Sequence, residues 1–527
     1  MSPRVDPPDS YSAYRQRGEV TQHDSGEFPQ LWMQNTTKGR VDGGFAELLR
    51  RRRGWFLRMT LAALAVRLFF ILRFPLITPD SLVYGDFAKN WLLHGIYGQS
   101  FASGAAPSYI RLPGYPAFLA ALFAVFGMDH YGAARFVQLF VDVATCFVIA
   151  DLARRLLGHS SHIARGERAA RWAFALAVFC PFLANYTAVP LTETWAIFFT
   201  ALALDCAVAG LQLCCPDLPG EAAPHLRWWV ACGLAIAAGI YLRPDGGMLL
   251  IAIGGYLLVR WLRTRDLRLL RAGLLLGLCA LAPLIPWTLR NWRAFHRFQP
   301  LAPVNANGPE EFFPYGFFRW EKTWIADYAS QEDVSFHVDG EPISFSALPS
   351  RAFDGAGQRQ RTEALFNAYN ETLDMTPELD AQFAGLARER IRQRPLRYYL
   401  GLPLLRAADM WLRPRTEMLP LNPHWWWIKA DPLDSAWSLL LAAINAAYLT
   451  AALIGWRRWA SLPLAAMLAA FVVVRTVLIT ALGAVEQRYM LECFPVVLVF
   501  AAGALARLGT PLKIAEGARL KAQGARL

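Results

Sequence analysis

Long apolar runs, separated by short basic segments, occupy most of the chain. A helix needs about 20 predominantly apolar residues to cross a bilayer, and many of these runs approach that length. The pattern therefore predicts an all-α polytopic membrane protein with about 10–12 transmembrane helices. The predicted spans are 55–76, 134–155, 170–188, 191–213, 228–242, 246–262, 271–289, 435–456, 460–482 and 489–507, with a shorter apolar helix at 114–127.

The character of the sequence changes between residues 291 and 432, where charged residues become frequent. This segment is predicted to form a small soluble domain, α or α/β, outside the membrane. Thr376-Pro377 predicts the start of a helix, with threonine as the cap, and Pro395 predicts its end. Residues 396–413 mix aromatic, apolar and basic side chains, which is typical of an interfacial helix. The tryptophan-rich segment 422–428 is typical of an aromatic belt.

The net charge is +12, and the basic residues gather in short loops between the predicted spans. Such loops stay on the cytoplasmic side, so the segments that carry Asp80, Glu193, Arg243 and Glu486 are expected on the extracytoplasmic face, together with the soluble domain. The charge does not indicate nucleic-acid binding, because no basic patch is interleaved with aromatic residues on a soluble domain.

The predicted topology is least defined between Arg111 and Arg154. The distribution of basic loops needs an odd number of crossings there, whereas two apolar segments are visible. Because 114–127 is short for a span, we expect it to be tilted, re-entrant or only partly inserted. Alternatively, one loop departs from the positive-inside tendency.

The first 45 residues are polar and lack the apolar region of a signal peptide, so the first span is expected to be a retained anchor. The patterns above divide the chain into parts along its length. These parts are a disordered cytoplasmic tail (1–50), an N-terminal transmembrane catalytic module (51–290) with an external loop (77–113), the extracytoplasmic soluble domain (291–432), C-terminal transmembrane helices (433–508) and a basic cytoplasmic tail (509–527).

Several kinds of chemistry lack their usual motifs in this sequence. The 8 cysteines lie in or beside apolar runs without any CxxC, which supports neither a disulfide framework nor a zinc site. No GxxxxGK[ST], HExxH or GxSxG motif occurs, which argues against a P-loop ATPase and against the common zinc and serine hydrolases. No metal and no cofactor are therefore expected.

Charged residues stand at the edges of apolar segments on the predicted outer face. Charges at membrane depth are costly, and a partner or a substrate explains them best. Several arginines suit a substrate that carries a phosphate at the lipid–water boundary, because arginine binds phosphate in a bidentate fashion and keeps its charge. The charged residues in question are Asp80, Asp86, Arg111, Glu193, Arg243, Asp245, Arg290, Glu486 and Arg488, and the polar Tyr489 stands beside the last of them.

Each of these residues also has a purely structural interpretation, although their joint occurrence on one face favours a substrate site. The structural alternatives are an N-cap for Asp80, the wet face of an amphipathic helix for Asp86 and Lys89, a local ion pair in a turn for Arg243 and Asp245, compensation of the helix dipole for Glu193, and snorkelling to the interface for Arg290 and Arg488.

The stretches PDSLVYGDFAKNWLLHGIYG and RLPGYPAFLAALFAVFG resemble the start of polytopic GT-C glycosyltransferases that use lipid-linked sugars. The resemblance is to bacterial members of the protein O-mannosyltransferase and aminoarabinose transferase group. In that group an Asp-Glu pair, followed three residues later by Tyr-Ala, marks the catalytic acid. Asp80 and Tyr84 match this spacing, whereas Ser81 and Gly85 replace the second acid and the alanine. The segment from Arg111 to Tyr115 is similar to the family's Lys-Pro-Pro-Leu-Tyr, whose lysine meets the lipid phosphate.

Further similarities are Thr192-Glu193 at the start of a later span, Arg243-Pro244, the stretch PWTLRNW, and the late Glu-x-Arg-Tyr that begins at Glu486. The resemblance covers roughly residues 55 to 295 and 435 to 507. The soluble domain matches nothing that identifies an acceptor.

The resemblance implies a bacterial inner-membrane enzyme with its active site on the periplasmic face. Its donor would be a sugar on a polyprenyl phosphate, and its acceptor a hydroxyl of a lipid, a glycan or a protein. A lipid-linked glycan polymerase or ligase remains an alternative, as does a transporter or flippase of a lipid-linked sugar, for which no inverted repeat is visible. The implied roles are an inverting general base at Asp80, with Glu193 and then Asp86 as further candidates, phosphate binding at Arg111, Arg243, Arg290 and Arg488, and a substrate pocket at Tyr84, Tyr115, Glu486 and Tyr489.

Overall fold

Helices make up almost all of the regular structure in the computed structural model, which describes residues 44–158, 163–212, 226–308 and 311–506. Each predicted span corresponds to a helix or to a pair of helices, because a backbone in lipid must satisfy its own hydrogen bonds. The apolar helices are α2 (Arg53–Arg73), α4 (Gly114–Phe126), α5 (Tyr131–Leu157), α6 (Ile163–Val178), α8 (Glu193–Gln212), α9 (Leu226–Leu242), α10 (Met248–Thr264), α11 (Leu267–Leu281), α12 (Leu284–Phe295), α18 (Pro432–Trp459), α19 (Pro463–Leu482) and α20 (Phe494–Leu505).

Within the described residues, eight helices are long and apolar enough to cross a membrane, or up to nine if the bent pair that includes α6 counts as one span. The predicted helix at 114–127 and the predicted span at 228–242 are the shorter apolar helices α4 and α9. The all-helical polytopic prediction is therefore confirmed. Fewer of the described helices reach the length of a span than the 10–12 predicted, because α4 and α9 are too short.

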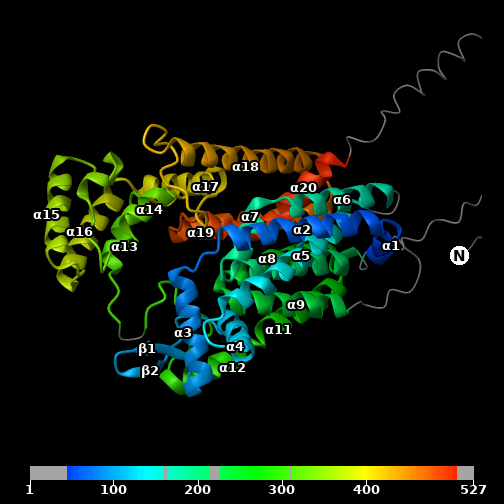
Figure 1. Cartoon of the computed structure of the whole chain (residues 1–527), viewed down its shortest axis with the longest axis horizontal. Helices are drawn as coiled ribbons and strands as arrows, with labels where there is room; N and C mark the ends of the chain where they lie inside the picture. Colours follow the sequence, from blue (N-terminus) through cyan, green and yellow to red (C-terminus); the bar gives the residue numbers. More distant parts are fainter. Residues whose placement is uncertain (1–43, 159–162, 213–225, 309–310, 507–527) are drawn as a thin grey trace, which may run out of the picture. The chain divides into compact units, whose positions relative to one another are not determined.

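The apolar helices pack into a bundle. Helix α5 packs against α2, α6 and α8, and α20 packs against α18 (Figure 1). The last pair depends on Gly455, because a Cβ atom added there would meet the backbone of Phe500. Small residues at such crossings let helix backbones approach one another, which is how helices associate in lipid.

Helix α6 ends inside the bundle, and a buried arginine explains why it can. Beyond Val178 the chain bends by 53° into α7 (Pro181–Ala184) and the short helix η2 (Asn185–Ala188). Arg67 of α2 donates to the free carbonyl oxygens of Ala177 and Val178 and pairs with Asp142 of α5 at 2.7 Å. The guanidinium group therefore replaces the hydrogen bonds that the broken helix lacks.

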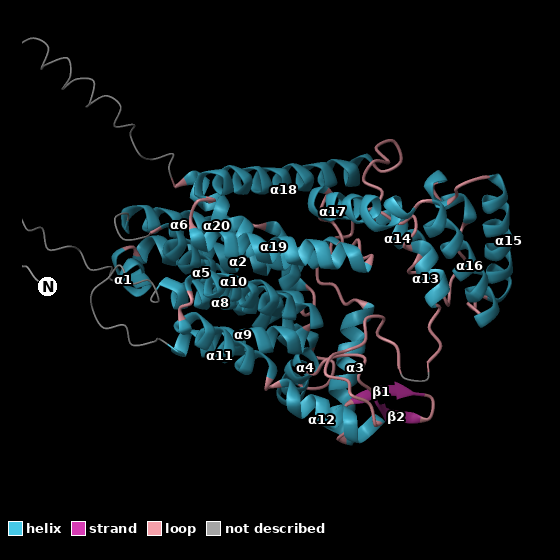
Figure 2. Ribbon diagram, turned by 180° about the vertical axis from the view of Figure 1, so that it is seen from behind, coloured by secondary structure: helices cyan, strands magenta, loops and turns pink. Residues whose placement is uncertain are grey.

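The predicted external loop 77–113 forms helix α3 (Pro79–His94) and an antiparallel hairpin of β1 (Gly98–Phe101) and β2 (Gly104–Pro107), beside which α12 lies (Figure 2). The hairpin was not predicted. Thr78 caps α3: its hydroxyl accepts from the Ser81 amide at 3.2 Å, and the Ser81 hydroxyl accepts from the Thr78 amide at 3.2 Å. The two residues form a capping box.

The described part of the predicted soluble domain contains helices and no strand, so of the two predicted classes it is α. Its helices are α13 (Tyr315–Glu321), α14 (Tyr328–Val334), α15 (Ala356–Thr372) and α16 (Pro377–Gln393), with the short turns η4 (Phe345–Ala347) and η5 (Ser350–Ala352). Phe317, Trp320 and Phe366 form its core. Thr376 caps α16, which ends at Gln393, as predicted.

The predicted interfacial helix is η6 (Arg397–Gly401), continued by α17 (Leu402–Leu412). Tyr399 and Leu404 are exposed, which fits an interfacial position. On its other side Arg406, 2% exposed, donates to the carbonyl oxygens of Lys322 at 2.6 Å, Ile325 at 3.0 Å and Thr480 at 3.5 Å. One side chain thereby ties the helical domain to the end of α19.

The predicted tails lie mainly outside the described residues, at 1–43 and 507–527. Their one described part differs from the prediction, because Gly44–Arg51 forms helix α1. Glu47 in its first turn and arginines in its last turn suit the helix dipole, and Leu48 is buried in the main core.

Candidate active site

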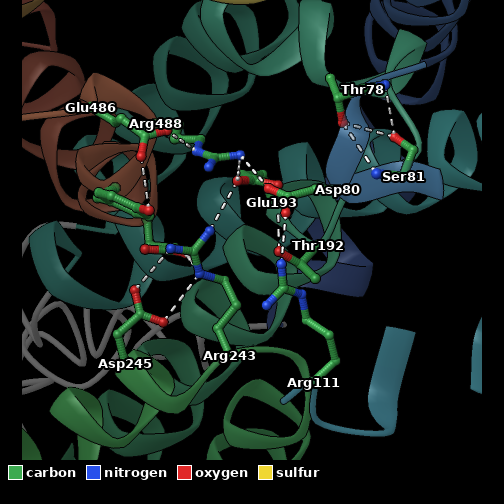
Figure 3. A network of polar contacts seen from close by, with 12 residues as sticks. Thr78, Asp80, Ser81, Arg111, Thr192, Glu193, Arg243, Asp245, Glu486 and Arg488 are labelled. Carbon is green, nitrogen blue, oxygen red and sulfur yellow. Dashed lines mark hydrogen bonds and ion pairs between the residues drawn. The ribbon is translucent and has the colours of Figure 1, made fainter. Parts of the chain in front are cut away.

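The candidate active site is built around Asp80, in the first turn of α3. Asp80 does not cap this helix, because Thr78 does, so its carboxylate is free to point away from the helix end. Its Oδ1 contacts Arg111 Nη2 at 2.9 Å, and its Oδ2 contacts Arg488 Nη1 at 3.2 Å (Figure 3). A residue from the external loop and another from the C-terminal helices thus converge on one carboxylate.

Arg488 connects this pair to the rest of the site. It lies in the short helix η7 (Gln487–Cys493), which precedes α20. Its Nε contacts Glu486 Oε2 at 2.6 Å, and its Nη1 lies 3.9 Å from Glu193 Oε1. Tyr489 donates its hydroxyl to Glu486 at 3.0 Å. The late Glu-x-Arg-Tyr motif therefore faces the acids of both α3 and α8.

Glu193 and Arg243 form the buried side of the site. Glu193 is the first residue of α8, and its side chain is 2% exposed. Arg243, just before the turn η3 (Pro244–Gly247), contacts Glu193 Oε1 at 2.9 Å and Asp245 at 3.1 and 3.3 Å. Its guanidinium carbon lies 4.8 Å from the ring centre of Tyr489. The local Arg243–Asp245 ion pair does exist, but it is one part of a larger network (Figure 3).

Of the three predicted pocket tyrosines, Tyr84 lies beside Arg111 and Tyr115 lies next to Tyr84. The Arg111 guanidinium carbon is 5.7 Å from the ring centre of Tyr84, whose ring meets that of Tyr115 edge-on at 5.2 Å. The Tyr115 hydroxyl donates to Gln138 at 2.6 Å. The ring of Tyr84, itself packed on Tyr115, thus helps to hold Arg111 beside Asp80.

Two predicted site residues have other partners. Asp86 accepts hydrogen bonds from the amide of Ser100 at 2.8 Å and from its hydroxyl at 2.6 Å, which anchors strand β1 to α3. Arg290 donates to the carbonyl oxygens of Ser108, at 2.9 Å, and Tyr97 at the two ends of the hairpin. Their observed contacts therefore stabilise the external loop and do not bring them to Asp80.

The sequence reasoning missed Arg475 and Glu492, which form a buried ion pair next to Asp245. Arg475 lies in the middle of α19 and is 1% exposed. An arginine inside the apolar run FVVVRTVLI was a usable signal, because a charge within a span needs a partner. Its acidic partners lie in other segments, which sequence spacing could not reveal.

The charges around Asp80 favour its ionised form. Burial raises the pKa of the Asp80 carboxyl, but the charges of Arg488 and Arg111 lower it more, so the pKa lies below its usual value. Asp80 is also the most exposed acid of the cluster, with 31% of its side chain exposed against 2% for Glu193. The described residues contain no group of three or more His, Cys, Asp or Glu side chains that could hold a metal ion.

One protein-family model matches part of the chain. The family model for dolichyl-phosphate-mannose-protein mannosyltransferases matches residues 110–287, a segment that contains Arg111, Tyr115, Glu193 and Arg243. No curated protein matches the chain significantly.

Two of the solved structures that match the chain in fold share little sequence with it. ArnT from Cupriavidus metallidurans bound to undecaprenyl phosphate is 16% identical, with a TM-score of 0.38 over 86% of this chain and 78% of that one. The oligosaccharyltransferase AglB from Archaeoglobus fulgidus, in complex with an inhibitory peptide and a dolichol-phosphate, is 14% identical, with a TM-score of 0.48 over 86% of this chain and 50% of that one. Residues 110–287, about a third of the chain, are thus similar to the family of dolichyl-phosphate-mannose-protein mannosyltransferases.

Proposed function

We propose that the protein transfers a sugar from a polyprenyl phosphate to an acceptor hydroxyl at the extracytoplasmic face, with inversion at the anomeric carbon. The observation that carries the proposal is the convergence of Arg111 and Arg488 on the partly exposed carboxylate of Asp80. Three arginines with exposed fractions between 14% and 20% surround this point, Arg243 being the third.

The arginines are suited to hold the donor phosphate. Guanidinium groups bind phosphate oxygens in pairs and keep their charge when partly buried. As the bond between the anomeric carbon and the phosphate oxygen breaks, the electron pair moves to the phosphate. Arg111, Arg243 and Arg488 would stabilise that charge from fixed positions, which is a preorganised electrostatic effect.

Asp80 is the best placed base of the three acids considered. The acceptor oxygen attacks the anomeric carbon from the face opposite to the phosphate, and its proton passes to Asp80. Glu193 is buried against Arg243, and Asp86 accepts two hydrogen bonds from Ser100. Asp80 alone combines exposure with a position beside the arginines. When the donor phosphate takes over Arg111 and Arg488, the Asp80 carboxylate loses the charges that depress its basicity.

The proposed face follows from the basic loops rather than from the site itself. The basic residues Arg51, Arg52 and Arg53 stand at the start of α2, and Asp80 follows the other end of this span. Because basic loops favour the cytoplasmic side, this arrangement supports an extracytoplasmic position for Asp80. The sugar and the acceptor stay open in this proposal.

The test compares the glycolipids and glycoproteins of cells that carry the wild-type chain, no chain, Asp80→Asn or Asp129→Asn. Mass spectrometry of wild-type and empty cells identifies the transferred sugar and its acceptor. Asp129 pairs with Lys89 at 3.1 Å away from the site and serves as the matched control. We expect Asp80→Asn to reduce transfer by about 10²–10⁴-fold, the usual size of general-base catalysis. Transfer within about tenfold of wild type, by a protein inserted at the normal level, would refute the assignment.

A further inference from the structure

We infer that Arg475, in the middle of the apolar helix α19, is a positioning residue that holds Arg243 and Arg488 in register for the donor phosphate. The inference rests on the proposed function and adds to it a residue that contacts neither the substrate nor Asp80. It concerns how the N-terminal and C-terminal halves of the site are joined.

Arg475 binds three groups, each of which neighbours a proposed phosphate-binding arginine. Its Nη2 contacts Asp245 Oδ2 at 2.7 Å, two residues along the chain from Arg243. It forms a close ion pair with Glu492, and its Nε donates to the carbonyl oxygen of Tyr489 at 2.6 Å. Tyr489 directly follows Arg488, so Arg475 fixes both arginine-bearing segments at once.

The same two carboxylates also face Arg243. Asp245 accepts from Arg243 Nε at 3.1 Å, and Glu492 lies 3.8 Å from that nitrogen. Arg243, Asp245, Arg475 and Glu492 therefore alternate in sign around a closed set of contacts, which we call the charge ring. The ring borders a small cavity lined also by Thr200 and Gly239.

The charge ring is balanced, with two guanidinium groups and two carboxylates. Asp245, Arg475 and Glu492 have side chains that are 13%, 2% and 3% exposed, so water cannot replace a lost partner easily. Without Arg475, two carboxylates compete for Arg243. That competition draws Arg243 away from Glu193 and from the position where the phosphate is proposed to bind. Loss of the bond to the Tyr489 carbonyl would also release the segment that carries Arg488.

The experiment measures the donor KM and kcat with purified protein and the polyprenyl-phosphate sugar identified by the test above. We expect Arg475→Met to raise the donor KM and to lower kcat/KM by about 10- to 100-fold, since a displacement of about 1 Å at a binding group has effects of that order. In Arg475→Met/Glu492→Gln the ring is balanced again, because one guanidinium faces one carboxylate. We expect this double variant to recover at least part of the donor affinity lost in the single variant.

The matched control is Arg67→Met/Asp142→Asn, which removes another buried intramembrane ion pair, 2.7 Å long and outside the site. We expect it to lower thermal stability while keeping the donor KM within about twofold of wild type, because none of its contacts involves the arginines of the site. If Arg475→Met does not fold, Arg475→Lys serves instead. Lysine keeps the charge but lacks the fork that reaches Asp245 and the Tyr489 carbonyl together.

The outcomes distinguish a failure of the positioning role of Arg475 from a failure of the proposed phosphate site. A normal donor KM in folded Arg475→Met or Arg475→Lys would overturn the positioning role. So would a double variant with a higher donor KM than the single variant, since that would indicate a packing role only. If instead Arg243→Ala and Arg111→Ala bind the donor normally, the proposed phosphate site itself is wrong, whatever Arg475 does.

Discussion

The contacts of Asp80 lead to an unexpected prediction: removing its charge should strengthen the binding of lipid phosphate. Both Asp80 oxygens are paired with arginines that the donor phosphate is proposed to use, Arg111 at 2.9 Å and Arg488 at 3.2 Å. In Asp80→Asn these pairs are lost, and the repulsion between the carboxylate and a bound phosphate is lost with them. The variant proposed to abolish transfer should therefore bind the phosphate better than the wild type does.

The size of the effect follows from the exposure of the groups. Asp80 is 31% exposed, Arg111 20% and Arg488 15%, so each ion pair is only partly shielded from water. Pairs of this kind contribute up to about 1 kcal/mol each. Two pairs correspond to about 1–2 kcal/mol, which is about a 5- to 30-fold lower Kd.

The assay is isothermal titration calorimetry. Undecaprenyl phosphate is added to purified wild-type protein, Asp80→Asn or Asp129→Asn in lipid nanodiscs, and the Kd of each is measured. Asp129→Asn changes the same charge at an exposed pair with Lys89 and should leave the Kd unchanged. An equal or weaker affinity for Asp80→Asn would refute the reasoning, because the carboxylate would then not compete with the phosphate.

Three further predictions test other parts of the molecule. Arg111→Ala should raise the Kd for undecaprenyl phosphate by about 10- to 100-fold, the effect of losing a charged hydrogen bond of about 1.5–3 kcal/mol, as titration will show. Thr78→Ala and Thr376→Ala each remove a helix cap worth about 1 kcal/mol, so both should lower stability in thermal unfolding, while only Thr78→Ala should also reduce transfer. Burial raises the pKa of Glu321 to about 8. The protonated form of Glu321 therefore stabilises the fold fully below its ordinary pKa of 4.5, and this stabilisation is lost as the pH rises towards 8. In unfolding experiments at pH 5 and 8, Glu321→Gln should abolish this loss.

The membrane helices could be predicted from sequence because the bilayer makes one strong demand, a long apolar helix, and leaves little freedom for tertiary context. The helix capped by Thr376 was predictable for a similar reason, since its start and stop signals are local. The hairpin at Gly98–Pro107 was not, because its small and polar residues lack the apolar alternation of a half-buried strand.

Sequence alone could not decide which of the predicted charged residues lie together in the site. A charge at the edge of a span looks the same whether it binds a substrate or anchors a loop. The structure separates the two: Asp80 meets distant arginines, whereas Asp86 meets Ser100 only 14 residues away. Arg475 was missed because its partners, Asp245 and Glu492, belong to segments that only the folded chain brings together.

Arg406 limits how far the helical domain can move away from α19. Its guanidinium group holds carbonyl oxygens of the helical domain and of α19 together. Moving that domain away from α19 would break hydrogen bonds of a charged group, which contribute about 1.5–3 kcal/mol each. We therefore expect the helical domain and α19 to move together, so that under the proposed function an acceptor would meet a preformed site.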